Sequence, residues 1–204
     1  MSATPHATRP VEGFLNTAQQ VAFQPREFFA RLPRRGDYGG PLLFYLICFE
    51  VSALLGGLLK LASVPWRYGP MWQQAQGQGT VGGWLASIIF APIGGVFAVF
   101  ILAGIVQLLV LLVVGARNEG YEATFRVAAY TGVTNLVTWI PVVGPLIGLY
   151  GIYLAIVGIR EIHGTTTGKA ATVVLLPFLV LFALTWLVLV AALAAVLGFA
   201  IASR

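Results

Sequence analysis

Long apolar stretches are the feature that most constrains how this chain can fold. Residues 84–114 are almost all apolar or small, and similar stretches occupy residues 41–63 and 170–202. Each is as long as the roughly 20 residues that a helix needs to cross a bilayer. Only 9% of the 204 residues are charged, against about 25% in soluble domains. We therefore expect an all-α polytopic membrane protein without a separate soluble catalytic domain.

Turn-forming residues divide the apolar part of the chain into a predicted bundle of five transmembrane helices. "PIGG" at residues 92–95 is expected to separate an interfacial piece from the span that follows, and Pro177 predicts a kink in the last span. "IPVVGP" at residues 140–145 predicts a tight turn. Small residues four apart predict close helix packing at Gly144/Gly148 and Gly151/Ala155. The expected spans are residues 41–63, 93–114, 122–140, 142–162 and 170–202, within one membrane domain over residues 41–204.

Residues 1–40 are expected to form a cytoplasmic tail with an amphipathic segment. Apolar residues recur at helical spacing between residues 14 and 32, and Pro25 interrupts the pattern. One interpretation is that one or two short helices lie on the bilayer surface, with the arginines of residues 26–35 facing anionic headgroups. The other is a tail whose apolar side packs against the membrane bundle. The N-terminus lacks the apolar region of a secretory signal peptide.

The distribution of Lys and Arg predicts the orientation of the chain. Cytoplasmic segments of membrane proteins are enriched in these residues. With five spans and a cytoplasmic N-terminus, most of them lie inside, namely Arg9, Arg26, Arg31, Arg34, Arg35, Arg117, Arg126, Arg160 and Lys169. The opposite side holds Lys60, Arg67 and Arg204. We therefore expect the N-terminus in the cytoplasm and the C-terminus on the opposite side.

The segment "HGTTTGKA" at residues 163–170 looks like a phosphate-binding loop. A P-loop reads G-x-x-x-x-G-K-[ST], follows a strand and opens a helix. Here only three residues separate Gly164 from Gly168, and Ala170 replaces the hydroxyl residue that binds magnesium. We therefore expect no nucleotide site. Instead, we expect Gly164 to end one span and Thr166 or Thr167 to cap the next, so that the segment is a turn between two helices.

Residues that could catalyse a reaction or hold a metal are scarce. Cys48 is the single cysteine, so neither an intrachain disulfide nor a cysteine metal cluster is expected. His163 alone cannot hold a metal, and no set of Ser, His and Asp indicates nucleophilic catalysis. The net charge of +5 comes without the basic, aromatic-rich patch typical of nucleic-acid binding. We expect a protein that is not an enzyme, with no cofactor and no nucleic-acid partner.

Residues 121–170, "YEATFRVAAYTGVTNLVTWIPVVGPLIGLYGIYLAIVGIREIHGTTTGKA", contain several motifs at the spacing of a known family. In chain order, their residues are Phe125, Arg126 and Tyr130; Pro141 and Gly144; Gly158, Ile162, His163 and Gly164; and Thr167, Gly168, Lys169 and Ala170. A Pro25-x-x-Phe28 segment precedes the first span. In these motifs the chain resembles the Ypt-interacting protein (Yip) family of five-span membrane proteins, over roughly residues 20–200.

The resemblance implies a location more than a function. Eukaryotic members of the family place the N-terminus in the cytosol and act in vesicle traffic with Rab-type GTPases. This chain has a shorter tail of 40 residues and uses ten Arg against two Lys, which suits a bacterial member, where no Rab cycle exists. We therefore expect a multi-pass protein of the cell inner (cytoplasmic) membrane, to which the Rab-related role does not transfer.

One group of candidate functional residues lies in the expected cytoplasmic loops. These charged and polar residues are Arg117, Glu119, Glu122, Arg126, Arg160, Glu161, His163, Thr166, Gly168 and Lys169. They could form a docking surface for a protein partner or for lipid headgroups; the alternative is a solvated, positive rim. The leading hypothesis is a non-enzymatic membrane-organisation or adaptor protein that acts through these loops, alone or as a homo-oligomer.

A second group lies within the expected spans. Glu50 is in the middle of the first span, where a carboxylate costs about 2.5 kcal/mol or more. It could bind a cation or proton, or fix helix packing, with Arg126 or a polar group of the third span as its partner. One helical stripe of that span carries Thr124, Thr131, Thr134, Asn135 and Thr138. The stripe could line a polar path or supply interhelical hydrogen bonds. The alternative hypothesis is therefore a transporter or channel for ions or small solutes.

Overall fold

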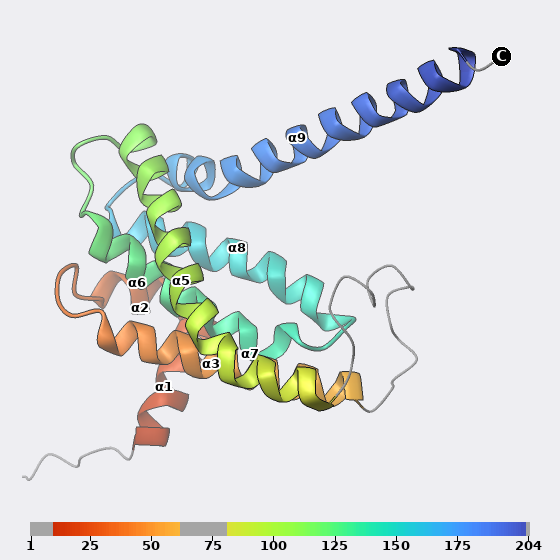
Figure 1. Ribbon diagram of the computed structural model, residues 1–204. Coiled ribbons are helices and arrows are strands. Elements are labelled where there is room, and N and C mark those ends of the chain that lie inside the picture. The colour runs from red at the N-terminus through yellow and green to blue at the C-terminus, as the bar shows by residue number, and fades with distance from the viewer. Residues whose placement is uncertain (1–9, 62–80, 203–204) are drawn as a thin grey trace, which may run out of the picture.

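The structure is a computed structural model that describes residues 10–61 and 81–202 (Figure 1). These residues form α-helices and one 3₁₀ turn, with no strand among them. The elements are α1 (Pro10–Phe23), α2 (Pro25–Arg31), α3 (Gly39–Leu61), α5 (Val81–Val113), α6 (Tyr121–Thr131), η1 (Gly132–Thr134), α7 (Asn135–Thr138), α8 (Val143–Ile162) and α9 (Thr167–Ala202). The predicted all-α fold is confirmed for this part of the chain, as expected where hydrocarbon forces the backbone to satisfy its own hydrogen bonds.

Four of these helices are long and apolar enough to cross a membrane. The candidate spans are Gly39–Leu59 in α3, Ile88–Val113 in α5, Val143–Ile162 in α8 and Thr167–Ala192 in α9. The chain is thus a membrane protein with several apolar helices. Residues 122–140, expected as a further span, are instead divided among α6, η1 and α7, each shorter than a span. By helix length and hydropathy, four spans are found among the described residues, and the fifth predicted span is not confirmed.

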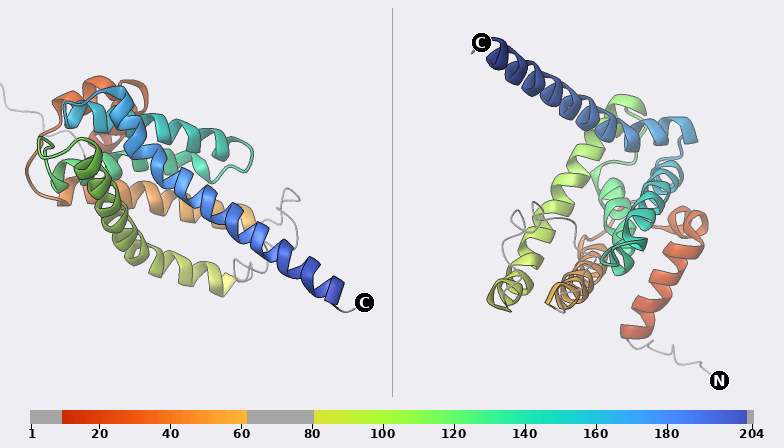
Figure 2. Two further views of the ribbon diagram at one scale, coloured as in Figure 1. Left: turned by 90° about the horizontal axis from the view of Figure 1, so that it is seen from above. Right: turned by 90° about the vertical axis from the view of Figure 1, so that its right-hand side faces the viewer.

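Two long helices continue through a proline. α5 passes through Pro92, and α9 passes through Pro177. The separate interfacial piece expected before residue 93 is therefore not observed, and the candidate span of α5 already begins at Ile88. Proline removes one backbone hydrogen bond, but apolar helices tolerate this loss where neighbouring groups satisfy the freed carbonyl. Figure 2 shows that α9 changes direction soon after its start, as expected for a helix with a proline in its first third.

The segment from α6 to α7 lies side by side with α8 in antiparallel register. Glycines of α8 make this close approach possible, since a side chain at these positions would meet the neighbouring segment. Three contacts follow the two segments in opposite directions. They join Val127 with Gly158, Thr134 with Gly151, and Thr138 with Gly144. The predicted close packing is thus confirmed at Gly144 and Gly151 but not at Gly148, where a Cβ would meet no described atom within 4 Å.

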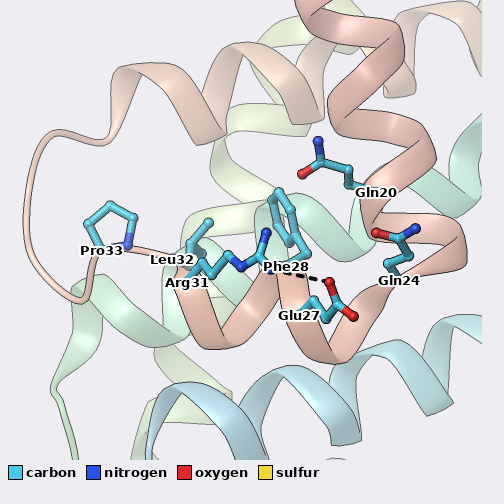
Figure 3. Close-up of a pocket in the computed structure, with 7 residues that line it drawn as sticks. All are labelled: Gln20, Gln24, Glu27, Phe28, Arg31, Leu32 and Pro33. Atoms are coloured by element: carbon cyan, nitrogen blue, oxygen red, sulfur yellow. Dashed lines mark hydrogen bonds and ion pairs between the residues drawn. The ribbon is translucent and has the colours of Figure 1, made fainter.

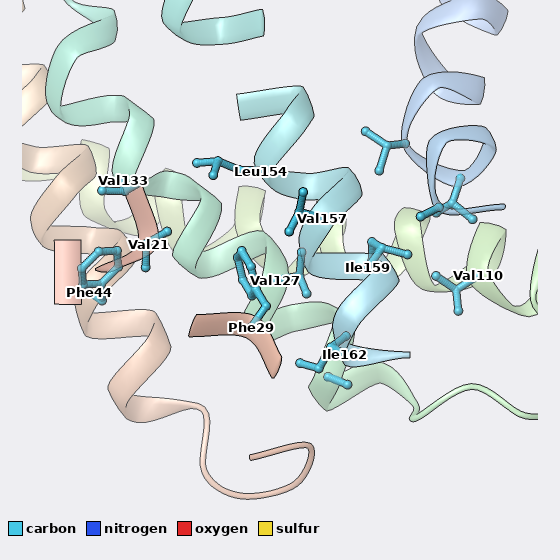
Figure 4. Packing of buried hydrophobic residues seen from close by; sticks show 14 of the residues in the cluster. Val21, Phe29, Phe44, Val110, Val127, Val133, Leu154, Val157, Ile159 and Ile162 are labelled. Carbon is cyan, nitrogen blue, oxygen red and sulfur yellow. The ribbon is translucent and has the colours of Figure 1, made fainter. Parts of the chain in front are cut away.

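The apolar side of the N-terminal segment packs against the bundle. Val21 of α1 and Phe29 of α2 are fully buried in the same cluster as Leu154 of α8 (Figure 4). The ring of Phe28 lies edge-on to that of Tyr130, with 4.9 Å between centroids. In Figure 1, α1 runs across the long helices rather than along them. α1 and α2 therefore cover one side of the core, as the second interpretation of the tail requires.

Candidate functional site

A buried polar cluster lies beneath the loops that join α5 to α6 and α8 to α9. His163, directly after α8, is 5% exposed. Thr124 of α6 is fully buried, and Gln107 of α5 is nearly so. Elements far apart in the sequence thus bring polar side chains to one interior site. Because a buried polar group is costly unless it is hydrogen-bonded, the partners of these side chains define the site.

The hydrogen bonds of the cluster form one continuous chain. The backbone N–H of Glu119 donates to Nδ1 of His163 at 3.1 Å, and Nε2 of His163 lies 3.0 Å from Oγ1 of Thr124. Thr124 donates to Oε1 of Gln107 at 2.5 Å. Gln107 in turn donates through Nε2 to Oδ1 of Asn118 at 2.9 Å. The cluster therefore joins α5, α6, their connecting loop and the end of α8.

This pattern fixes the protonation state of His163. Nδ1 accepts the N–H of Glu119, so it carries no proton. The proton of the neutral ring is then on Nε2, which donates to Thr124 while the Thr124 hydroxyl donates to Gln107. A proton on Nδ1 would face the N–H of Glu119, one donor against another. Burial lowers the pKa of His163 to about 4. At neutral pH the ring is neutral and holds the two loops together.

Residues 34–37 tie the start of α3 to the start of α6. A salt bridge and two hydrogen bonds make this connection. They are Arg34 to Glu119 at 2.7 Å, the N–H of Gly36 to Oε2 of Glu122 at 3.1 Å, and Nη2 of Arg126 to the carbonyl of Asp37 at 3.0 Å. The segment before the first long helix and the loop over the polar cluster therefore form one connected layer at this end of the bundle.

The turn between α8 and α9 consists of a helix stop followed directly by a helix start. Gly164 has a φ of +58°, in the left-handed region, and the N–H of Thr165 donates to the carbonyl of Arg160 at 3.0 Å. This is the glycine-dependent ending called a Schellman motif. Oγ1 of Thr166 accepts the N–H of Lys169 at 3.4 Å and so caps α9. The expected glycine stop and threonine cap are confirmed, with Thr166 as the cap.

The expected docking residues divide by exposure. Exposed are Arg117, Thr166, Gly168 and Lys169; half-buried are Glu119, Glu122, Arg160 and Glu161; buried are Arg126 and His163. Arg160 and Glu161 form an ion pair with each other, and Nη1 of Arg160 donates to Oγ1 of Thr167 at 3.3 Å. The surface that a partner could reach is thus mainly the turn at residues 164–169, with Arg117 exposed in the loop before α6. His163 is buried at the base of the turn, whereas Arg126 contacts residues 36 and 37.

The candidates within the spans do not share one site. The hydroxyls of the threonines at 131, 134 and 138 donate to carbonyls of their own segment, at residues 127, 131 and 135, rather than to another helix. Asn135 is half-buried at the start of α7. Oε1 of Glu50 is buried, without a hydrogen-bond partner among the described residues. Arg126 is not that partner, because it donates to Asp37, more than three helical turns from Glu50 along the chain.

Gln107 and Asn118 were missed as functional candidates by sequence reasoning. Gln107 interrupts an otherwise apolar helix, and its amide bonds both Thr124 and Asn118. A lone amide within a span is a signal that could have been used, because it needs a partner in hydrocarbon. Asn118 gives no such signal, since asparagine is common in loops.

The comparisons with known proteins agree with this picture. The sequence matches the family model of the Yip1 domain over residues 20–189. The match includes every residue of the polar cluster and the turn at residues 164–169. Comparison with curated proteins and with solved structures gives no match.

Proposed function

Since the chain belongs to the Yip1 domain family, we propose that it is a non-enzymatic membrane adaptor that binds a protein partner through the turn at residues 164–169. The observation that carries this proposal is the contrast between the turn and its base. Thr166, Gly168 and Lys169 are exposed, while His163 beneath them is locked in a buried hydrogen-bond chain. A surface that is already rigid loses little conformational freedom on binding, which favours affinity.

The proposal includes a five-span topology with the N-terminus and this turn in the cytoplasm. α8 is a candidate span, and residues 121–138 lie antiparallel to it along its length. A bilayer crossed by α8 would then also be crossed by these residues. Residues 131, 132, 134 and 135 keep right-handed helical dihedrals through the 3₁₀ turn. The segment would be about 27 Å long, close to the roughly 30 Å of a hydrocarbon core.

The proposed orientation rests on the distribution of charge. Arg34, Arg117 and Lys169 lie at the end of the bundle that carries the polar cluster and its loops. Positive charge is enriched on the cytoplasmic side of membrane proteins. This supports a cytoplasmic position for that end, with the C-terminus on the opposite side. The bacterial inner membrane is proposed from the tail of 40 residues and the use of ten Arg against two Lys.

The adaptor proposal is tested by photo-crosslinking in native membranes. A photoreactive amino acid replaces Thr166 in the full chain, and a matched control replaces Val142, which is exposed in the turn at the other end of α8. The expected result is one discrete protein adduct from position 166 that position 142 does not give. Adducts with lipid alone, or the same adducts from both positions, would contradict the proposal. Adducts between copies of this chain would indicate a homo-oligomer instead.

One observation favours a second candidate, a transporter or channel for cations or protons. Oε1 of Glu50 is buried in a candidate span without a hydrogen-bond partner in the described part of the chain. Intramembrane carboxylates are common in ion pathways. Cysteines at Thr131, Thr134 and Thr138, in a Cys48→Ala background, would react with a water-soluble thiol reagent if a wet path ran past them. Uniform protection of all three would count against transport.

A further inference from the structure

A surface pocket lies between the end of α1 and α2, outside the polar cluster. Its volume is about 240 Å³, and its polar lining comes from Gln20, Gln24, Glu27 and Arg31 (Figure 3). Its apolar lining is Phe28, Leu32 and Pro33. Phe28 is held in place by ring contacts with Phe29 and Tyr130, at centroid distances of 5.4 and 4.9 Å. The apolar wall of the pocket is therefore fixed to the bundle, while the charged side faces outward.

The position of α2 sets the depth of this pocket along the bundle. The ring of Phe29 lies 3.2 Å from where a Cβ on Gly158 would be. Gly158 precedes the end of the α8 span at Ile162 by about 6 Å along the helix axis. That depth is where headgroups meet acyl chains in a bilayer crossed by α8. The pocket is thus within reach of a lipid headgroup.

The polar groups of the pocket carry one charge of each sign. Nη2 of Arg31 lies 3.3 Å from Oε2 of Glu27, with the two side chains 80% and 63% exposed. Such an exposed pair contributes little to stability, so both groups are free to turn towards a ligand. Gln20 donates through Nε2 to Asn16, which leaves its carbonyl oxygen as an acceptor. The side chain of Gln24 makes no hydrogen bond with the rest of the described chain.

We propose that this pocket binds the headgroup of a zwitterionic phospholipid with a primary ammonium group, of the ethanolamine type. The phosphate is held by Arg31, and the ammonium by Glu27 and the amide oxygens of Gln20 and Gln24. The glycerol end lies against Phe28 and the neighbouring apolar wall.

Two features of the lining select this headgroup over others. Quaternary ammonium groups are recognised by cages of several aromatic rings, and Phe28 is the one aromatic ring among the described lining residues. A choline headgroup also has no N–H to donate to Glu27. An anionic headgroup would find a single cation, Arg31, opposed by a carboxylate. The balance of charge and acceptors therefore fits an ethanolamine headgroup best.

The test compares lipid retention by the full chain in nanodiscs. The nanodiscs contain equal amounts of phosphatidylethanolamine, phosphatidylcholine and phosphatidylglycerol, and native mass spectrometry counts the lipids that remain bound. The expected result for the unmodified chain is preferential retention of phosphatidylethanolamine. Glu27→Gln should lower that retention by about three- to tenfold, because it removes a charged acceptor. Arg26→Gln is the matched control, since Arg26 is exposed on α2 outside the pocket.

Several outcomes would overturn the proposal. These are equal retention of the three lipids, an equal loss in the Arg26→Gln control, or a preference for phosphatidylglycerol, which would indicate a general basic surface. If soluble phosphoethanolamine displaced the bound phosphatidylethanolamine at a concentration as low as that of the lipid, the ligand would come from solution rather than from the membrane. Because Glu27 and Arg26 are exposed, both variants should fold normally, and an unchanged melting temperature checks this. The adaptor proposal does not depend on any of these results.

Discussion

The imidazole of His163 connects the loop before α6 with α6 itself through two hydrogen bonds, and both require the neutral ring. Nδ1 accepts from the backbone of Glu119, and Nε2 faces the hydroxyl of Thr124. Thr124 cannot donate to both His163 and Gln107, so its bond to Gln107 sets the direction of the chain. One buried side chain thereby orients four polar groups and the base of the turn above it.

We expect the folded state to lose stability as the pH falls from about 6.5 towards 4. The pKa of the His163 ring is lowered by burial from 6.5 to about 4 in the folded protein. The unfolded chain therefore takes up the proton first. The contribution of the neutral ring is fully present above pH 6.5 and is lost as the pH falls through the folded value, by about 3 kcal/mol in all. Unfolding of the protein in nanodiscs, followed as a function of pH, measures this loss.

The variant His163→Asn is the control for this pH dependence. Its amide oxygen can still accept the N–H of Glu119, but it cannot be protonated in this range. The variant should be less stable at neutral pH, because the bond to Thr124 is lost, and its stability should vary less between pH 6.5 and 4. An unchanged slope in His163→Asn would show that another group causes the pH dependence.

At the scale of elements, α8 approaches α6 and α2 most closely at Gly158. A Cβ on Gly158 would lie 2.6 Å from Cγ1 of Val127 and 3.2 Å from the ring of Phe29. Gly148 of the same helix is exposed and has room, since a Cβ there would meet no described atom within 4 Å. The same substitution is therefore expected to have opposite consequences at the two positions.

Gly158→Ala should destabilise the protein by about 1–3 kcal/mol, because the added methyl group forces α8 away from α6 and α2. Gly148→Ala is the matched control and should be neutral or slightly stabilising, because alanine favours a helix by up to about 1 kcal/mol over glycine. Thermal unfolding of both variants in the same detergent gives the comparison. Similar melting temperatures for the two variants would refute the close packing at Gly158.

Most helices of this chain could be predicted from its apolar runs, but their interruptions could not. Hydropathy and length give the spans in α3, α8 and α9, and the motif around Gly164 gives the turn between α8 and α9. Pro92 was expected to divide α5 and does not, because its effect depends on neighbouring groups that the sequence does not show. The polar site was only partly predictable: His163 and Thr124 were noticed, but their meeting with Gln107 depends on tertiary packing.

At the scale of the whole molecule, the chain forms a packed bundle from which one long helix extends. α1 and α2 cover one side of the bundle, and most of α9 projects away from it (Figure 1, Figure 2). Exposed apolar residues such as Leu181 and Trp186 cover α9, as expected for a helix surrounded by lipid. The polar cluster and its loops gather at one end. The separation of the apolar surface of α9 from the polar end of the bundle supports a protein that acts at one membrane surface.

The most direct test of this arrangement is a map of which side of the membrane each loop faces. Single cysteines replace Ala116, Val142 and Thr166, all exposed, in a Cys48→Ala background. A membrane-impermeant thiol reagent is then applied to intact cells and to permeabilised cells. With five spans and a cytoplasmic N-terminus, position 142 reacts in intact cells, whereas positions 116 and 166 react only after permeabilisation. If positions 116 and 142 react from the same side, residues 121–138 do not cross the membrane, and the proposed single functional face is contradicted.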